Sequence, residues 1–233
     1  MGENETIENL QAMAADMRRL IVEMLAVSGG GHFGGSLSVV EILTTLYGAV
    51  MRVNPKEPQW PDRDRLVLGK GHAACALCAV LAQEGFFDRK LLDTFNKLDS
   101  PFGMHPDMNK IPGCDMSTGS LGNGISPAVG MALAARADGK DYRVYVVLGD
   151  GECREGTAWE AAMTASHLKL GSLTAVVDRN RLSLDGSTEE INALEPLGER
   201  WRSFGWRVLN VDGHDIGPLR DALMDAQSSH DRP

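Results

Sequence analysis

A single carboxylate between two glycines is the feature of this sequence that most directly suggests chemistry. Gly149-Asp150-Gly151 ends an apolar run, and Asn180 ends the next apolar run along the chain. Because ligands of open parallel sheets bind beyond the carboxyl ends of the strands, we expect Asp150 and Asn180 to lie close together. Carboxylate and amide oxygens suit a hard cation such as Mg²⁺ or Ca²⁺, and the flanking glycines let the backbone approach a bulky anion.

Helix capping is the alternative interpretation of Asp150. An aspartate at the start of a helix can simply accept hydrogen bonds from the first backbone N–H groups. Gly-Asp-Gly alone does not separate the two interpretations. The amide oxygen of Asn180 at the end of the following strand favours the cation site.

Three histidines lie in turns that contain glycine or proline. His32 falls in the glycine cluster GGGHFGG, His72 in GKGH, and His105 in GMHPD. One loop histidine is usually a solvated side chain. Three of them near the expected site suggest a polar cavity that binds anionic groups or moves protons.

The cysteines allow a redox or metal interpretation that the surrounding residues disfavour. Cys75 and Cys78 form a CxxC pair, but a zinc site would need a second pair or nearby histidines. The segment ACALCAVLAQ has the small apolar side chains of a buried helix, in which cysteine packs as a small hydrophobe. We therefore expect reduced thiols and a cytoplasmic protein, with a redox pair as the alternative.

Alternating helices and strands must position these residues. Short apolar strands separated by amphipathic helices predict right-handed βαβ units, hence an α/β domain with a parallel sheet and helices on both faces. Capping boxes at Ser38–Glu41 and Thr157–Glu160 predict two helix starts, and Asp88 is expected to cap a third helix. Helices are predicted over 7–24, 38–51, 74–83, 88–98, 128–139, 157–169, 197–205 and 217–227. A turn and a short strand are predicted within 60–71, further strands over 143–151, 173–180 and 206–213, and a long loop over 99–127.

Bulk composition excludes several classes of function. The 233 residues show no linker or repeat, so we expect residues 1–233 to form one domain. A formal charge of −9 argues against binding to nucleic acid. The N-terminus is acidic and polar rather than signal-like, and no run approaches the length of a membrane span, so no membrane partner is expected.

Taken together, these segments resemble one family. The chain is similar to the N-terminal, diphosphate-binding half of transketolase, most closely to the separate small subunit of transketolases split into two polypeptides. The similarity runs from about residue 10 to the C-terminus. Its motifs occur in family order: SGGGHFGGSLS, DRDRLVLGKGHA, GMHPD, STGSLGNGIS, GDGECREGTAWEAA and VDRNRLSLDG.

The resemblance implies that thiamine diphosphate and a divalent cation bind together. Asp150, Asn180 and the backbone carbonyl of Leu182 would bind Mg²⁺, or Ca²⁺ or Mn²⁺, which bridges the diphosphate. The remaining cofactor contacts that the resemblance implies are the N–H of Gly151 beside Gly149, the side chain of His72, and Gly119, Ser120 and Leu121 along the aminopyrimidine.

The resemblance also implies the reaction and a partner. His32 and His105 would face the substrate hydroxyls and move protons, and Glu155 would lie at the subunit contact. The family transfers a two-carbon ketol unit from a ketose to an aldose, with sugars or sugar phosphates as substrates. The glutamate that activates the aminopyrimidine belongs to the second half. We therefore expect activity only with a C-terminal transketolase subunit, as an α2β2 assembly.

Two departures and three alternatives accompany this interpretation. Phe33 stands where the family usually has proline, which could reshape the sugar entrance. Family members also carry a further histidine in a segment that would follow Pro233, so either this chain is abbreviated or another segment supplies that group. The alternatives are another thiamine-dependent subunit (2-oxo acid dehydrogenase E1 or deoxyxylulose phosphate synthase type), a non-catalytic cofactor-binding relative, and a flavodoxin-like nucleotide binder.

Overall fold

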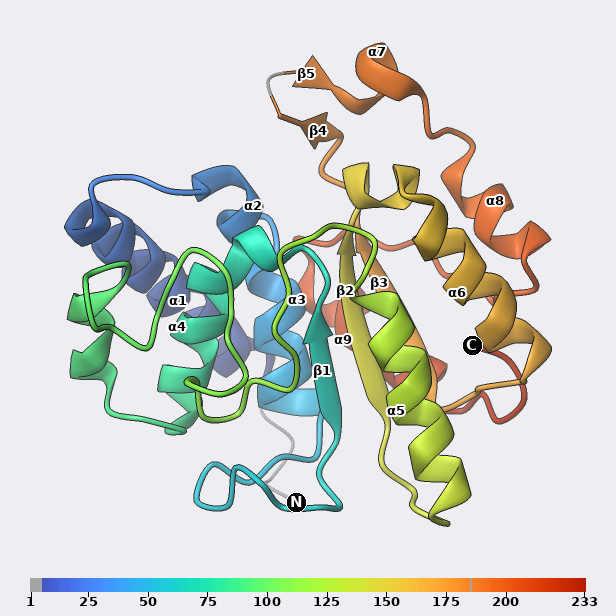
Figure 1. Ribbon diagram of the computed structural model, residues 1–233, viewed down its shortest axis with the longest axis horizontal. Coiled ribbons are helices and arrows are strands. Elements are labelled where there is room, and N and C mark those ends of the chain that lie inside the picture. The colour runs from blue at the N-terminus through green and yellow to red at the C-terminus, as the bar shows by residue number, and fades with distance from the viewer. Residues whose placement is uncertain (1–5, 185) are drawn as a thin grey trace.

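A parallel sheet forms the centre of the molecule (Figure 1). The computed structural model describes residues 6–184 and 186–233. Residues 1–5, part of the N-terminal segment that we expect not to be a signal peptide, lie outside the described residues. Strands β1 (Arg65–Leu68), β2 (Val144–Gly149) and β3 (Leu173–Asp178) lie in that order, and all three run in the same direction. Both faces of β2 are buried, as expected for a strand covered by helices on each side.

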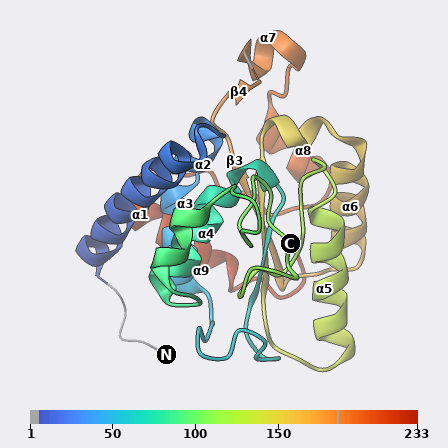
Figure 2. The ribbon, with the colours of Figure 1, turned by 60° about the vertical axis from the view of Figure 1, so that its left-hand side comes forward.

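Alternate side chains of β2 enter two separate hydrophobic clusters, one on each face. Tyr145 and Val147 join the cluster built by α1, α3, α4 and α9, whereas Val146 and Leu148 join the cluster of α5, α6 and α8. Figure 2 shows these helices as layers on opposite sides of the sheet, which confirms the predicted α/β fold. The helices run over α1 (Ile7–Ser28), α2 (Phe33–Leu37), α3 (Val40–Thr45), α4 (Ala74–Glu84), α5 (Ile125–Ala137), α6 (Gly156–His167), α8 (Leu197–Ser203) and α9 (Ile216–Ala226).

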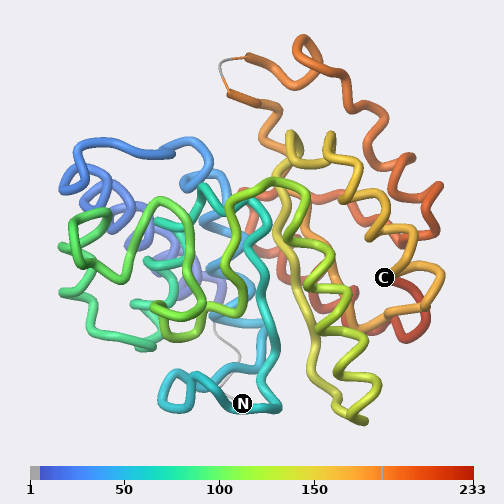
Figure 3. The backbone as a smooth tube through the Cα atoms, in the orientation of Figure 1, coloured from blue at the N-terminus to red at the C-terminus, as the bar shows by residue number. Residues whose placement is uncertain are grey.

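The carboxyl ends of the strands share one edge with several short elements. Figure 3 lets the reader follow the long loop, in green, from the helices beside β1 to the start of α5. An arm of β4 (Leu182–Ser183), β5 (Gly186–Ser187) and α7 (Thr188–Asn192) stands beyond the same edge (Figure 1). The remaining short helical segments of the described residues are the π-helix η1 (Leu46–Val50) and the 3₁₀ helices η2 (Gly71–Ala73), η3 (Arg89–Thr94) and η4 (Gly151–Arg154).

Both predicted capping boxes are wrong. Helix α3 begins at Val40 and α6 at Gly156, and neither start has a side-chain cap. Ser38 instead donates from Oγ to Asp178 at 2.6 Å, because the fold places the end of β3 beside it. Asp88 does act as a cap, accepting from the N–H of Lys90, but the element it caps is the 3₁₀ turn η3 rather than an α-helix.

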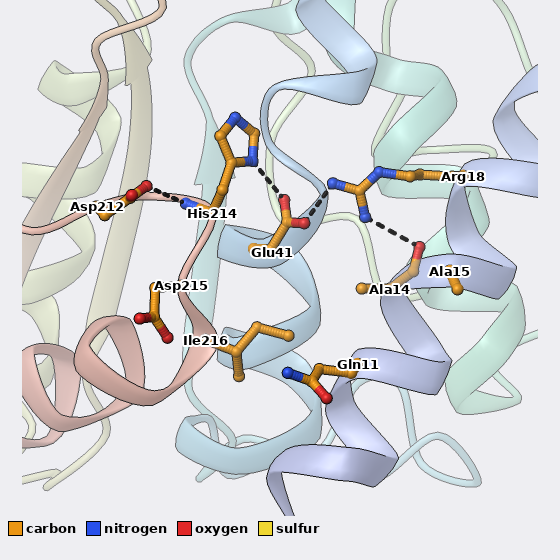
Figure 4. Close-up of a pocket in the computed structure, with 9 residues that line it drawn as sticks. All are labelled: Gln11, Ala14, Ala15, Arg18, Glu41, Asp212, His214, Asp215 and Ile216. Carbon is orange, nitrogen blue, oxygen red and sulfur yellow. Dashed lines mark hydrogen bonds and ion pairs between the residues drawn. The ribbon is translucent and has the colours of Figure 1, made fainter.

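Glu41, the other half of the first predicted box, is tied to distant elements. Its carboxylate is 8% exposed and contacts the guanidinium of Arg18 on α1 and Nδ1 of His214, the latter at 3.1 Å. Figure 4 shows the three side chains meeting beside a cavity of about 500 Å³ between α1, α3 and the start of α9. These long-range ion pairs outcompete the local cap because they neutralise a buried charge.

The strand predicted over 206–213 is also wrong. Residues 206–212 pair with no strand within the described part of the chain. Residues of β3 and of the segment 207–214 line a shared cavity of about 590 Å³. The four central residues of β3 are accordingly only half-buried, although its two ends are buried.

One stretch contradicts the expectation that no run approaches a membrane span. Phe33–Val50 is long and apolar enough by composition, with a mean hydropathy of 1.3 over 18 residues. It comprises α2, α3 and η1, and 56% of it is buried inside the molecule. Its apolar side chains, such as Leu43 and Leu46, belong to the core cluster that covers β2, so packing within the fold accounts for their composition.

Candidate functional site

Asp150 and Asn180 follow the carboxyl ends of two neighbouring strands, β2 and β3. Gly149 at the end of β2 is in register with Asp178 at the end of β3. Asp150 follows Gly149 and is 1% exposed; its Oδ2 accepts the N–H of Arg181 at 2.7 Å. The loop after β3 therefore wraps around the Asp150 carboxylate and carries Asn180 with it.

The capping interpretation of Asp150 accounts for one of its oxygens. Oδ1 accepts the N–H of Gly151 at 2.7 Å, which caps the short turn η4. Oδ2 is directed to the neighbouring strand instead, because it bonds Arg181. Asp150 is thus both a local cap and a carboxylate shared between two strand ends.

The oxygens gathered here fit a hard divalent cation. They are the carboxylate of Asp150 and the amide oxygen of Asn180, which accepts the N–H of Leu182 at 2.9 Å. Leu182, whose carbonyl the resemblance assigns to the metal, begins β4 two residues later. Carboxylate, amide and carbonyl oxygens are the donor set that Mg²⁺ and Ca²⁺ prefer. A Cβ at position 151 would lie 3.0 Å from Oγ of Ser183, so a larger residue there would require Ser183 to shift.

The structure brings together the three loop histidines. The ring centroid of His32 lies 5.4 Å from that of His72 and 6.3 Å from that of His105. Glycines make this approach possible: a Cβ on Gly35 would lie 2.6 Å from His72, and one on Gly119 would lie 3.3 Å from His105. The three rings are neighbours, while the polar cavity and the proton-transfer role expected for them stay predictions.

Burial and nearby positive charge lower the pKa of His72 to about 4, with Lys70, His32 and His105 as the charged neighbours. The ring is therefore neutral near pH 7 in the unliganded chain. A neutral imidazole can donate one hydrogen bond, and an arriving anion would favour its protonation.

We expect this depressed pKa to make the protein less stable in acid. Between pH 6.5 and 4 the unfolded chain binds a proton that the folded chain does not, so the free energy of unfolding falls as pH falls. Allowing for solvent screening, the loss between pH 7 and 5 should be about 1 kcal/mol. Urea unfolding at both pH values should show this loss, and His72→Gln should remove it. An equal loss in His72→Gln would contradict the assignment; His167→Gln controls for replacing an exposed histidine.

A buried ion pair that the sequence analysis missed supports the histidine turn. Lys70 is fully buried, and its Nζ lies 2.5 Å from Oδ2 of Asp178 and 3.3 Å from Oγ of Ser38. The pair joins the turn after β1, which carries His72, to the end of β3. Its signal was present in the sequence, as a lysine between two glycines and an aspartate ending an apolar run, but only the fold places them together.

Glu152 is a second buried residue that sequence reasoning missed. Oε2 accepts the N–H of Gly149 and Oε1 accepts the N–H of Gly122, each at 3.0 Å. Burial raises the pKa of Glu152, and these two backbone bonds oppose the rise. The side chain thereby fastens the loop that carries Gly119, Ser120 and Leu121 to the end of β2.

The residues assigned to the aminopyrimidine and to the subunit contact lie on the surface. Gly119, Ser120 and Leu121 are exposed, and so is Glu155 at the N-cap position of α6. Gly122 has φ +82°, and a Cβ there would lie 2.4 Å from Cβ of Glu155, so only glycine lets the loop and the helix start approach. The two features are therefore neighbours on one face.

The cysteines are buried and unpaired, as predicted for small apolar side chains in the core. All four are buried, and burial raises the pKa of Cys75 to about 12 and that of Cys78 well above its usual value. Thiolates are strongly disfavoured under these conditions, so the CxxC lacks the low-pKa thiol of a redox pair. Within the described residues, no group of histidines, cysteines and carboxylates forms a metal cluster.

Comparisons with known proteins agree with this geometry. Residues 9–233 match the family model described as transketolase, thiamine diphosphate binding domain. The chain is 47% identical to the 6-deoxy-6-sulfo-D-fructose transketolase subunit of a Clostridium species, covering 97% of this chain and 82% of that protein. It is 43% identical to an apulose-4-phosphate transketolase subunit of Phocaeicola vulgatus, covering 97% and 80%.

Solved structures show the same fold. Transketolase from Leishmania mexicana has a TM-score of 0.91 and 31% identity, covering 99% of this chain. Transketolase from Pichia stipitis in complex with sedoheptulose 7-phosphate has a TM-score of 0.91 and 35% identity, covering 96%. The chain spans about a third of these longer polypeptides, with 36% and 35% of their lengths covered. It therefore belongs to the transketolase family and corresponds to the thiamine diphosphate-binding subunit of the family's two-part members.

Proposed function

We propose that this chain holds thiamine diphosphate through a divalent cation and, together with a second subunit, transfers a two-carbon ketol unit from an anionic ketose to an aldose. The observation that carries the proposal is the hydrogen bond between Asp150, after β2, and the loop after β3 that contains Asn180. The Lys70–Asp178 pair joins the end of β3 to the turn of His72, whose ring lies with those of His32 and His105. The family match over residues 9–233 supports the cofactor.

The residues of this chain divide the work between holding the cofactor and handling the substrate. Asp150, Asn180 and the carbonyl of Leu182 bind Mg²⁺, and Gly151 with His72 contact the diphosphate. When bound, thiamine diphosphate supplies a nucleophilic carbon that can attack a ketose carbonyl. The exposed loop 119–121 provides the surface for the aminopyrimidine.

His32 and His105 provide the acid–base groups in the part of the active site that this chain contributes. Both are exposed and lie in loops at the carboxyl edge of the sheet, so a sugar can reach them. Their rings can accept or donate protons at the substrate hydroxyls, because an imidazole carries two nitrogens that can serve as donor and acceptor. Phe33, which is 43% exposed beside His32, lies where it can contact the entering sugar.

The substrates we propose carry an anionic group remote from the carbonyl. The names of the two relatives specify a sulfonated fructose and a phosphorylated apulose, respectively. Those sugars differ in skeleton and share an anion at the far end. A ketose of this class is therefore the donor we propose for this chain.

A second chain completes the site in this proposal. The exposed positions of loop 119–121 and of Glu155 form one face that a partner can cover, and the two relatives are named as subunits. We propose an α2β2 assembly in which Glu155 lies at a contact between subunits. The predicted absence of activity in the isolated chain follows from the same arrangement.

Reconstitution tests the proposal. This chain by itself, a C-terminal transketolase subunit by itself, and their mixture are assayed for ketol transfer from fructose 6-phosphate and from 6-deoxy-6-sulfofructose, with thiamine diphosphate and Mg²⁺. We expect activity only in the mixture. Cofactor binding by the chain with no transfer in any mixture would favour the non-catalytic relative.

A further inference from the structure

The carboxylate of Asp150 already has a cationic partner within this chain. Its side chain is 2% exposed, and Arg179 donates from Nη1 to Oδ2 over 2.8 Å. Arg179 directly follows β3 and is itself only 20% exposed. Because a buried carboxylate without a nearby positive charge is destabilising, this pair stabilises the site before any metal arrives.

The same guanidinium has a second set of partners, on the arm and on the segment between α7 and α8. Nη2 lies 3.0 Å from Oε1 of Glu189 and 2.9 Å from Oε1 of Glu195, and Nε lies 3.1 Å from that same oxygen of Glu195. Nη1 also donates to Oγ1 of Thr188 at 2.8 Å. These groups can hold the charge of Arg179 without the help of Asp150.

A divalent cation bound to Asp150 would compete with Arg179 for the same carboxylate. Oδ2 already accepts from Arg179 and from the N–H of Arg181, and Oδ1 accepts from Gly151. A carboxylate offers about four acceptor positions in all. A dication at Asp150 would also lie beside a fixed positive charge in a poorly solvated site, where repulsion is strong.

We propose that Arg179 is an internal counter-ion that holds Asp150 in the metal-free chain and competes with the divalent cation for it. On metal binding the guanidinium withdraws to Glu189 and Glu195, so cation affinity is coupled to the position of the arm. The inference rests on the proposed metal site at Asp150 and Asn180. Arg179 thus acts as a positioning residue, setting how tightly the site takes its metal.

Removing the charge of Arg179 should tighten cation binding. Mn²⁺ is titrated into the full chain with thiamine diphosphate present, and free Mn²⁺ is followed by electron paramagnetic resonance. We expect Arg179→Gln to bind Mn²⁺ about tenfold more tightly, the equivalent of one charged hydrogen bond no longer competing. The metal-free variant should unfold at a lower temperature than the metal-free wild type. Arg179→Lys keeps the charge and should retain an affinity close to wild type.

Two further variants distinguish failure of the counter-ion role from failure of the metal site. Arg181→Gln makes the same change in net charge two residues away, at an exposed side chain, and preserves the backbone N–H that bonds Asp150. Unchanged or weaker Mn²⁺ binding in Arg179→Gln, or equal tightening in Arg181→Gln, would overturn the counter-ion role while leaving the metal site standing. If Asp150→Ala binds Mn²⁺ as wild type does, the metal site itself is wrong and the inference falls with it.

Discussion

Asp150→Ala is expected to abolish metal-dependent binding of thiamine diphosphate. The substitution removes the only carboxylate assigned to the cation, and Mg²⁺ is usually held by one or two protein carboxylates together with phosphate oxygens. We expect the affinity of the chain for the cofactor in the presence of Mg²⁺ to fall at least about 100-fold, since loss of supporting groups alone costs 10- to 100-fold. Calorimetric titration measures the effect, and ketol transfer in the two-subunit mixture should fall in parallel.

Folding must be separated from binding in this variant. Asp150 also accepts hydrogen bonds from Gly151, Arg181 and Arg179, so its loss removes the acceptor that the backbone N–H groups of Gly151 and Arg181 use. Asp150→Asn keeps the shape and an acceptor oxygen but lacks the charge, and it should lose most of the metal dependence. Asp221→Ala, at an exposed position of α9, controls for loss of an acidic residue. Wild-type affinity in Asp150→Asn and Asp150→Ala would contradict the assigned cation site.

Lys70→Met is expected to cost about 3 to 5 kcal/mol in the free energy of unfolding. Lys70 is fully buried against Asp178, and methionine fills similar space without a charge. The carboxylate of Asp178 would keep only the hydroxyl of Ser38 among the partners described here. Urea denaturation measures the loss. The pKa of His72 should also rise in this variant, because the charge of Lys70 helps to lower it.

A surface pair and a double variant complete this test. Lys140 contacts Asp62 at 2.5 Å with both side chains well exposed, so Lys140→Met should change the stability far less. Replacing both buried partners, as in Lys70→Met with Asp178→Leu, should recover part of the loss because no uncompensated charge remains. A small effect of Lys70→Met, comparable with that of Lys140→Met, would show that the pair does not support the turn.

Periodicity and strand ends were sufficient to predict the centre of the site. The alternation of apolar strands and helices predicted the parallel sheet, and the ends of β2 and β3 then placed Asp150 near Asn180. The histidine cluster followed from glycine-containing turns at the same edge. These features depend on local pattern and on the general geometry of parallel sheets, which a single sequence does carry.

Long-range electrostatics explain most of what the sequence did not reveal. Glu41 satisfied the pattern of a capping box, yet it bonds Arg18 and His214, which are 23 and 173 residues away along the chain. Lys70 pairs with Asp178, which is 108 residues further along the chain. The segment 206–213 has the composition of a strand, but a strand also needs a neighbour at hydrogen-bonding distance. Such pairings depend on the assembled fold rather than on local pattern.

The most direct test of the central claim is calorimetric titration of thiamine diphosphate into the wild-type chain, with Mg²⁺ and with a chelator in its place. We expect binding with Mg²⁺ that is lost in the chelator and strengthened by a C-terminal transketolase subunit. Equal binding with and without the cation, or no binding even with Mg²⁺ and the second subunit, would contradict the claim that Asp150 and Asn180 hold a metal diphosphate.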